Sequence, residues 1–317
     1  MDEFELIARY FAPLQLADPD LILGTGDDAA VFALAPGAQL VVAVDTVVEG
    51  VHFPAGTPAA AIGYRVAAVN LSDFAAMGAV PRYATLALTL PQVDAAWLAG
   101  FAAGLGRALA VADVSLIGGD TTRGPLTATV QMMGVAAGPL LTRRGAHAGD
   151  VIAVSGTLGD ACAGLAVLQA AWPAVPAHPL VERFLWPVPR LALGQALNRL
   201  ASAAIDISDG LLADVGHLAQ ASACRAVIEV DQLPLSAALL AHCAGNEARR
   251  CALSGGDDYE LALCIPAPNV AAAHAVAEQQ AVPFSVIGQM HAGHGVSCRR
   301  RDGRVYAPPA RGYRHFT

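Results

Sequence analysis

The sequence contains no lysine, and all 19 of its basic side chains are arginines. This absence excludes three lysine-dependent kinds of site: the Gly-Lys-Ser/Thr phosphate loop, the strand lysine of protein kinases and the Schiff-base lysine. Any phosphate chemistry in this chain must therefore rely on metal ions, arginine and backbone amides.

Charge is scarce as well, because only 15% of the residues are charged while 55% are hydrophobic. The formal net charge of −8 argues against nonspecific nucleic-acid binding, in which lysine and arginine contact phosphates. A chain of 317 residues with this much apolar material predicts two folded domains, each with a hydrophobic core.

Cysteine is sparse and follows no pattern. The six cysteines form no C-x-x-C pair. We interpret them as small apolar side chains of a protein in a reducing compartment. The acidic start, with Asp2, Glu3 and Glu5, does not resemble a secretory signal. Apolar stretches are interrupted before the roughly 18 residues that a membrane helix needs. We therefore expect a soluble cytoplasmic protein without membrane or nucleic-acid partners.

The most informative stretch is the glycine-spaced turn at residues 24–30, which presents Asp27 and Asp28 side by side. Adjacent aspartates repel each other and are poor strand and helix formers. A divalent cation such as Mg²⁺ explains them, because hard cations take oxygen ligands. A solvated turn is the alternative.

The acidic theme then recurs along the chain. Each further segment combines aspartate with glycine, serine, threonine or asparagine, and together they are residues 44–46, 70–73, 118–122, 206–210 and 255–260. Several follow an apolar strand, which is where ligand sites gather in mixed α/β proteins. One such aspartate is usually a turn residue or a helix cap, but the recurrence favours a common ligand role.

In the first half, strands are predicted at residues 31–35 and 40–44, the second of them ending at Asp45. The helical spacing of residues 58–77 places Asn70 and Asp73 three apart on one stripe, either as a surface pair or, as we favour, with Asp73 as a ligand. His52 lies close to these acids and is a candidate substrate contact, although a lone histidine is more often structural.

In the second half, a strand at 203–207 leads to Ser208, which we expect to cap a helix with Asp209 in its first turn. Helix capping by itself would account for Asp209, but the two aspartates on either side of Ser208, Asp206 and Asp209, favour a ligand-binding role. Arg143 is either a phosphate contact or part of a solvated linker. Residues 137–149 form the predicted boundary between domains at 1–137 and 149–317.

Taken together, these motifs resemble the thiamine-monophosphate kinase family. Its superfamily also holds aminoimidazole-ribotide synthetase, selenophosphate synthetase and a hydrogenase-maturation protein. The resemblance spans essentially the whole chain and is carried by residues 24–30, 44–46, 52–53, 69–78, 116–125, 141–145 with 150, 204–210, 253–261 and 312–316. The segments at 70–78 and 118–125 are specific to this branch.

The resemblance implies a two-domain α/β (α+β) fold of the aminoimidazole-ribotide synthetase type. Its N-terminal mixed sheet would bind ATP and metal and form a shared barrel with a second subunit, and its C-terminal domain would be α+β. It implies transfer of the γ-phosphoryl group of ATP to thiamine monophosphate with several Mg²⁺ ions. We expect direct in-line transfer, because the acceptor phosphate is already an anion.

The resemblance also assigns roles to individual residues. The implied metal ligands are Asp28, Asp45, Asp73, Asp120, Asp206 and Asp209, and the first four would act directly in catalysis. Gly119, Asp120, Arg143 and Ser208 would face ATP. The residues His52, Asp257 and Tyr313 would line the thiamine phosphate pocket.

Some positions depart from the family pattern. Ala43 and Val44 stand where Ser-Thr is common, so any metal contact there must come from backbone carbonyls. Asp257 stands where glutamate is common, and the ring type varies at Tyr313. Two alternatives stay open: aminoimidazole-ribotide synthesis, against which the 69–78 motif argues, and a nonenzymatic metal-binding protein, whose acids would cluster in one short loop.

Overall fold

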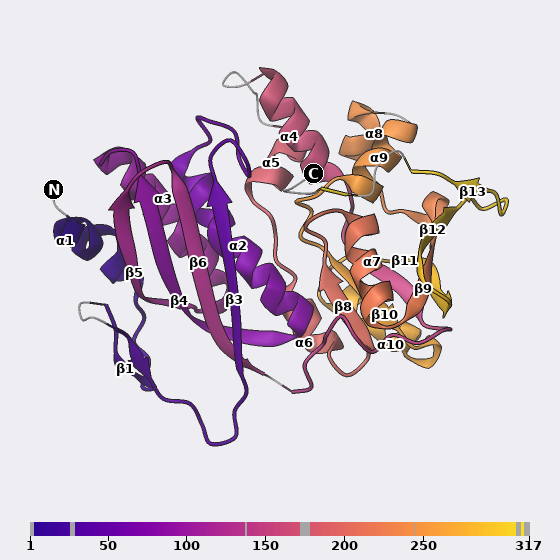
Figure 1. Ribbon diagram of the computed structural model, residues 1–317, viewed down its shortest axis with the longest axis horizontal. Coiled ribbons are helices and arrows are strands. Elements are labelled where there is room, and N and C mark those ends of the chain that lie inside the picture. The colour runs from indigo at the N-terminus through magenta and orange to yellow at the C-terminus, as the bar shows by residue number, and fades with distance from the viewer. Residues whose placement is uncertain are drawn as a thin grey trace. The chain divides into compact units, whose positions relative to one another are not determined.

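The computed structural model describes residues 3–25, 29–136, 138–171, 178–243, 245–308 and 312–313. Asp28 therefore lies outside the described residues. Contacts divide the chain into two compact units, the first of Met1–Phe74 with Ala79–Ala137 and the second of Ala75–Gly78 with Gly138–Thr317. Figure 1 shows the elements of each unit.

The first unit is built on a four-stranded mixed sheet in the order β3-β6-β4-β5. Its strands are β3 (Leu40–Val48), β6 (Thr127–Ala136), β4 (Ala79–Leu90) and β5 (Ser115–Arg123). β6 is antiparallel to both β3 and β4, whereas β4 and β5 run parallel. The helices α2 (Ala59–Met77) and α3 (Ala95–Leu109) lie behind this sheet in Figure 1.

The two helices approach each other closely. A Cβ atom on Gly104 of α3 would lie 1.9 Å from the carbonyl oxygen of Ala60, so only glycine fits there. The Asp94 side chain caps α3 by accepting from the backbone N–H groups of Ala96 and Trp97 at 2.8 and 3.0 Å. The segment Ala95–Ala112 has the length and hydropathy of a membrane helix, with 39% of it buried. Its packing against α2 makes it a core helix of this unit.

The N-terminal segment is anchored to β4. It contains α1 (Glu3–Leu6), a π-helical turn (Ile7–Phe11), a 3-10 turn (Ala12–Leu14) and the short strands β1 (Leu21–Leu23) and β2 (Val31–Phe32). Arg82 pairs with Asp18 and Asp20 at 2.8 and 2.9 Å, and the Tyr83 hydroxyl donates to Asp18 at 2.9 Å. These contacts hold the segment against the sheet.

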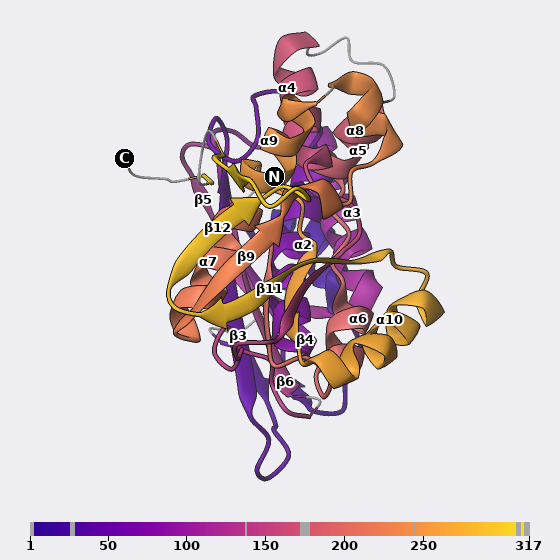
Figure 2. The same cartoon turned by 90° about the vertical axis from the view of Figure 1, so that its right-hand side faces the viewer.

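The second unit contains a seven-stranded sheet in the order β13-β12-β9-β11-β7-β10-β8. Neighbouring strands are antiparallel except for β12 and β9, which run parallel. Figure 2 shows β12, β9 and β11 face-on. The strands are β7 (Val151–Ser155), β8 (Ala203–Asp206), β9 (Cys224–Glu229), β10 (Leu261–Ile265), β11 (Phe284–Ala292), β12 (Gly295–Arg299) and β13 (Val305–Tyr306).

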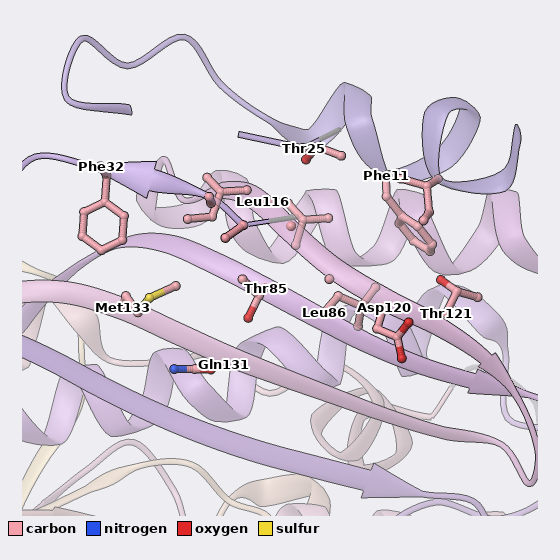
Figure 3. A pocket seen from close by; sticks show the side chains of 16 residues that line it. Phe11, Thr25, Phe32, Thr85, Leu86, Leu116, Asp120, Thr121, Gln131 and Met133 are labelled. Atoms are coloured by element: carbon pink, nitrogen blue, oxygen red, sulfur yellow. The ribbon is translucent and has the colours of Figure 1, made fainter. Parts of the chain in front are cut away.

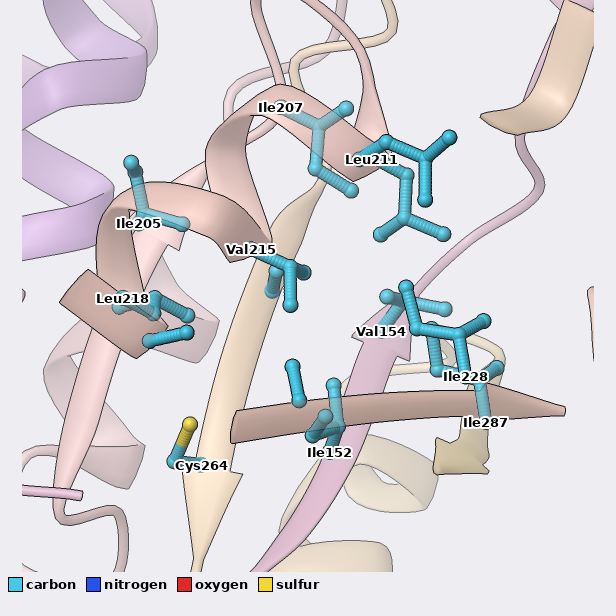
Figure 4. Packing of buried hydrophobic residues seen from close by; sticks show 14 of the residues in the cluster. Ile152, Val154, Ile205, Ile207, Leu211, Val215, Leu218, Ile228, Cys264 and Ile287 are labelled. Carbon is cyan, nitrogen blue, oxygen red and sulfur yellow. The ribbon is translucent and has the colours of Figure 1, made fainter. Parts of the chain in front are cut away.

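Seven α-helices of this unit lie within the described residues: α4 (Asp160–Ala171), α5 (Pro179–Leu185), α6 (Leu191–Leu197), α7 (Leu211–Ala221), α8 (Ala237–His242), α9 (Asn246–Ser254) and α10 (Val270–Gln279). The main core lies between α7 and the sheet. Val215 and Leu218 of α7 pack with Ile152, Ile205 and Cys264 from the strands (Figure 4). Burying such side chains stabilises the fold by roughly 1.5–3 kcal/mol each.

Several expected boundaries are wrong. β3 continues to Val48, so Asp45 lies inside the strand. The strand predicted at 114–117 extends as β5 to Arg123, so the motif at 118–122 is part of the strand and does not follow it. Helix α7 begins at Leu211 with Gly210 as N-cap, so Ser208 does not cap it. The proline content of residues 172–190 predicts a connection without secondary structure, but this stretch contains α5, and no helix is predicted where α9 lies.

Candidate active site

The first group of acids joins the middle of β3 to the C-terminal part of α2. The side chains of Asp45 and Asp73 share a hydrogen bond. Burial raises the pKa of Asp45, and Asp73 and the nearby His52 partly offset this rise. Two carboxylates at hydrogen-bond distance must share a proton or lie beside a cation.

His52 is fixed by the turn that follows β3. The backbone N–H of Val48 donates to its Nδ1 atom at 3.1 Å, and the backbone N–H of His52 donates to the Val48 carbonyl at 2.9 Å. Nδ1 is therefore an acceptor, which places the proton of the neutral ring on Nε2. The structure thus brings three expected site residues together: Asp45, Asp73 and His52.

Asn70 adds an unusual oxygen to this region. It is fully buried one helical turn before Asp73, and its Nδ2 donates to the Val66 carbonyl at 3.0 Å. Its Oδ1 is buried and has no hydrogen-bond partner in the described part of the chain. Such an orphaned acceptor costs free energy unless a ligand satisfies it.

Asp120 lies on the other face of the same sheet. The register aligns it with Ala87, Thr129 and Thr46 across β5, β4, β6 and β3, whereas Asp45 aligns with Val130 in the next row. The Thr46 and Thr129 hydroxyls form a hydrogen bond of 2.8 Å, which confirms that the side chains of the Asp120 row lie on one face of the sheet. Since neighbouring strands are about 4.8 Å apart, Asp45 and Asp120 are separated by roughly 14 Å.

Asp120 borders a cavity of about 680 Å³ in the first unit. The sheet forms its floor, and the N-terminal segment closes it. Figure 3 shows Phe32 and Met133 at one end and Phe11 with Asp120 toward the other. Gly119 is required beside it, because a Cβ there would lie 2.0 Å from the Leu86 carbonyl oxygen. An apolar cavity with few polar groups suits a flat ring with a charged end.

The second group of acids lies in the second unit, where β8 leads into α7. One carboxylate oxygen of Asp214 accepts the backbone N–H groups of Ser208, Asp209 and Gly210, each at 3.1 Å. Burial, together with the charges of Asp206 and Asp209, raises the pKa of Asp214 to about 7. Asp214 therefore shapes the turn that carries Ser208 and Asp209.

Two more expected residues contact the same turn. The backbone N–H of Asp257 donates to the Ser208 carbonyl, and that of Tyr313 donates to the Asp209 carbonyl, both at 2.9 Å. Asp257 has a φ of 71°, a left-handed conformation that is costly outside glycine. Such strain is typical of loops held for function.

Five expected residues thus assemble in the second unit: Asp206, Ser208, Asp209, Asp257 and Tyr313.

Arg143 does not join this group within the second unit. Its carbonyl accepts from the Ser222 hydroxyl at 3.1 Å, which places it at the C-terminal end of α7. Asp209 precedes the N-terminal end of that helix, and eleven residues span roughly 16 Å. The Arg143 side chain is exposed, and the carbonyl of the preceding Thr142 accepts from the backbone N–H of Ala204 in β8 at 3.0 Å.

Sequence reasoning missed Asp214. An aspartate in the first turn of a helix is usually explained by the helix dipole, and only its burial reveals a different role. The available signal was its position among apolar residues, since Leu211, Leu212 and Val215 surround it in the sequence.

The donor chemistry of both acidic groups fits Mg²⁺. All candidate ligands are oxygens: the carboxylates of Asp45 and Asp73, the orphaned oxygen of Asn70, and the carboxylates of Asp206 and Asp209. Among the described residues, however, no three His, Cys, Asp or Glu side chains converge into a complete ion site. Mg²⁺ commonly takes one or two carboxylates and completes its shell with phosphate and water.

The chain matches two family models. Residues 26–136 match "AIR synthase related protein, N-terminal domain", and residues 147–300 match the corresponding C-terminal domain. The thiamine-monophosphate kinase of Salmonella typhimurium is 47% identical, covering 99% of this chain and 98% of its own length. The enzyme of the same name from Escherichia coli (strain K12) is 48% identical with the same coverage.

Solved structures are similar as well. Thiamine-monophosphate kinase from Stenotrophomonas maltophilia K279a superposes with a TM-score of 0.88 at 44% identity, covering 96% of this chain and 98% of that one. A structure described as "AaThiL complexed with AMPPCP and TMP" has a TM-score of 0.80 at 31% identity, covering 90% of this chain and 89% of that one. The hydrogenase maturation protein HypE, at 19% identity and a TM-score of 0.76, shares the fold alone.

Proposed function

The chain belongs to the thiamine-monophosphate kinase family of the AIR synthase-related proteins, and we propose that it transfers the γ-phosphoryl group of ATP to the phosphate of thiamine monophosphate. The products are thiamine diphosphate and ADP. The observation that carries this proposal is the full-length likeness to enzymes of this name, one of which is described in complex with AMPPCP and TMP.

The reaction needs charge neutralisation and alignment more than a nucleophilic side chain. The attacking oxygen belongs to a phosphate and is already an anion, so no base has to activate it. Bound Mg²⁺ would supply the positive charge that screens donor and acceptor phosphates from each other. Asp45 and Asp73, Asp206 and Asp209 would hold these ions, together with Asp28 and Asp120.

The chain's own residues prepare this arrangement. A cation bound between Asp45 and Asp73 would supply the positive charge that this close carboxyl pair lacks, and would offset the effect of burial on the pKa of Asp45. In the second unit, Asp214 holds the backbone of residues 208–210 in a fixed turn, which would present Ser208 to ATP and Asp209 to a metal ion. Catalysis therefore rests on positions set before the substrates bind.

For the two substrates we keep the contacts that the family resemblance implies. ATP contacts Gly119, Asp120, Arg143 and Ser208, and we place its nucleoside in the cavity beside Asp120 because the apolar walls suit a flat ring. Thiamine phosphate contacts His52, Asp257 and Tyr313. Transfer is direct and in line, without a phosphoenzyme.

A homodimer is proposed from the sheet of the first unit. Leu40, Val42 and Val44 of β3 are 47, 49 and 62% exposed, and β3 is the edge strand. A contiguous apolar face on an edge strand is a liability unless another surface covers it. A second copy of the same sheet would bury it and close a barrel.

The roles of the two domains and the cellular compartment are part of the same proposal. Residues 1–137 form the ATP-binding and dimerisation domain and residues 149–317 the α+β domain, a division supported by the contact units and the two family models. The cytoplasm is the proposed location, because ATP is a co-substrate and the six cysteines are free.

The experiment that tests the function is an acceptor panel. The purified protein is incubated with ATP and Mg²⁺ and with thiamine monophosphate, thiamine or formylglycinamidine ribotide, and the products are separated by chromatography. Thiamine diphosphate formed only from thiamine monophosphate supports the proposal. ATP consumption stimulated by the ribotide instead would assign the chain to aminoimidazole-ribotide synthesis.

A further inference from the structure

Three thiols lie close together in the second unit. Cys162 is the third residue of α4, Cys251 lies in α9, and Cys243 follows α8. The side chains of Cys162 and Cys251 share a hydrogen bond, and Nη2 of Arg250 lies 3.9 Å from Sγ of Cys251. No role in the proposed reaction uses these residues.

Two glycines bring the cysteines together. A Cβ on Gly255 would lie 2.4 Å from Cβ and 2.8 Å from Sγ of Cys162, and a Cβ on Gly159 would lie 2.9 Å from Cβ of Cys251. Any larger residue at either position would push α4 and α9 apart. The close approach of the two helices, and with it the sulfur contact, is therefore built into the backbone.

The two thiols differ in their exposure and in the groups around them. The hydrogen bond from Cys251 and the charge of Arg250 lower the pKa of Cys162 to about 7, against the opposing effects of burial, Glu247 and Asp257. The same hydrogen bond and burial raise the pKa of Cys251. Cys162 is half-buried, while Cys251 is only 3% exposed. One thiol is thus a nucleophile that small oxidants can reach, and the other is a protected partner.

We propose that Cys162 and Cys251 form a peroxide-sensitive pair that closes to an intrachain disulfide. The Cys162 thiolate attacks a peroxide oxygen; the S–O bond forms as the O–O bond breaks, and the departing oxygen leaves as water after taking up a proton. The Cys251 sulfur then attacks the sulfenic sulfur; the S–S bond forms, the S–O bond breaks, and a second water leaves with the Cys251 proton. Two thiols lose two electrons, and one hydrogen peroxide becomes two waters.

Formation of the disulfide moves the loop that precedes Asp257. Gly255 packs directly on Cys162, so shortening the sulfur contact to a bond of about 2.05 Å shifts the start of this loop. This consequence rests on the proposed function, in which Asp257 contacts thiamine phosphate. Since misplacement by 1 Å can cost up to 10²-fold in rate, we expect oxidation to lower kcat/KM at least ~3-fold, reversibly.

The test is peptide mapping of the folded full chain after treatment with a few molar equivalents of hydrogen peroxide and quenching with N-ethylmaleimide. Because the chain lacks lysine, trypsin cleaves only after arginine and leaves Cys162 on a peptide that begins at Gly145. Cleavage after Glu260 separates Cys251 from Cys264. We expect the Cys162–Cys251 peptide pair as the main oxidation product, lost on treatment with dithiothreitol.

Three variants test whether Cys162 pairs with Cys251 and not with Cys243. Cys162→Ser abolishes the link, Cys251→Ala leaves a Cys162 sulfenic acid that dimedone traps, and the matched control Cys243→Ser retains the link. In the unoxidised protein at pH 7, Cys162 reacts with N-ethylmaleimide at least ~10-fold faster than Cys243. A link through Cys243, or oxidation of Cys162 without any link, overturns the proposal. The peptide assay needs no substrate, so its outcome is independent of the kinase activity.

Discussion

Asp45 on β3 and Asp73 on α2 share a hydrogen bond between their carboxyl groups, and burial raises the pKa of Asp45. In a folded protein this is an unfavourable arrangement that persists only where the surrounding structure enforces it. The same is true of Asp214, whose pKa is raised to about 7 by burial and by two neighbouring aspartates. The protein thus contains two clusters of neighbouring carboxyl groups in which burial raises a pKa, one in each unit.

The first prediction concerns this pair. Asp73→Asn should lower kcat/KM by roughly 10²-fold or more, because a ligand for the phosphate-bound cation is lost. The metal-free protein should be as stable as the wild type or more stable, since the substitution removes a like-charge contact. Activity assays and thermal unfolding with and without Mg²⁺ measure both effects, with Asp113→Asn on an exposed turn as control. Full activity of the Asp73→Asn protein would show that Asp73 is not a ligand of the catalytic metal.

The second prediction concerns the turn held by Asp214. Asp214→Ala leaves three backbone N–H groups without their acceptor, and we expect a loss of about 2–4 kcal/mol in the free energy of unfolding. Asp214→Asn keeps one acceptor oxygen and should cost only about 1 kcal/mol. Urea unfolding measures both values. Equal stability of the alanine and asparagine variants would show that these hydrogen bonds do not hold the turn.

The third prediction concerns the exposed face of β3. Val42→Arg places a charge in the proposed dimer interface and should convert the dimer to a monomer in analytical ultracentrifugation. The matched control is Val111→Arg, because Val111 is also exposed, at 56%, but lies beside α3 and not on the sheet. A wild-type protein that sediments as a monomer would contradict the shared barrel directly.

The fourth prediction concerns Tyr313. Its backbone N–H donates to the Asp209 carbonyl at 2.9 Å whatever the side chain, and the side chain is 48% exposed. Tyr313→Ala should therefore leave stability unchanged and raise the KM for thiamine monophosphate by roughly 10-fold, with the KM for ATP unchanged. If the KM for ATP rises instead, the ring belongs to the nucleotide site.

Much of the fold could be predicted from sequence periodicity. The predicted helix at 58–77 corresponds to α2, and a helix predicted from an Asp94 cap to about residue 112 corresponds to α3. Strands predicted at 127–135, 151–155 and 261–265 correspond to β6, β7 and β10, and all of these segments are strongly patterned. Helix α9 was missed because only Ala248, Cys251, Ala252 and Leu253 are buried among many polar neighbours. The length of β3 was missed because an aspartate normally ends a strand.

The candidate site was predictable in composition but not in arrangement. The recurrent aspartates could be recognised in the sequence because glycine, serine or threonine lies beside them. Which of them meet depends on strand register, and a shift of one residue moves a side chain to the opposite face. Asp45 and Asp120 therefore lie on different faces of one sheet, although both follow apolar strand residues. The apolar sequence neighbours of Asp214 hinted at its burial, but its contacts with the 208–210 turn could be identified only in the structure.

The measurement that tests the central claim most directly is transfer of label from γ-³²P-ATP, run with and without Mg²⁺ on the wild type and on Asp120→Asn. We expect the label in the terminal phosphate of thiamine diphosphate, strictly dependent on Mg²⁺ and lost in the variant, with none on the protein. Label recovered on the protein, or no labelled thiamine diphosphate from the folded wild type, would contradict direct phosphoryl transfer to thiamine monophosphate.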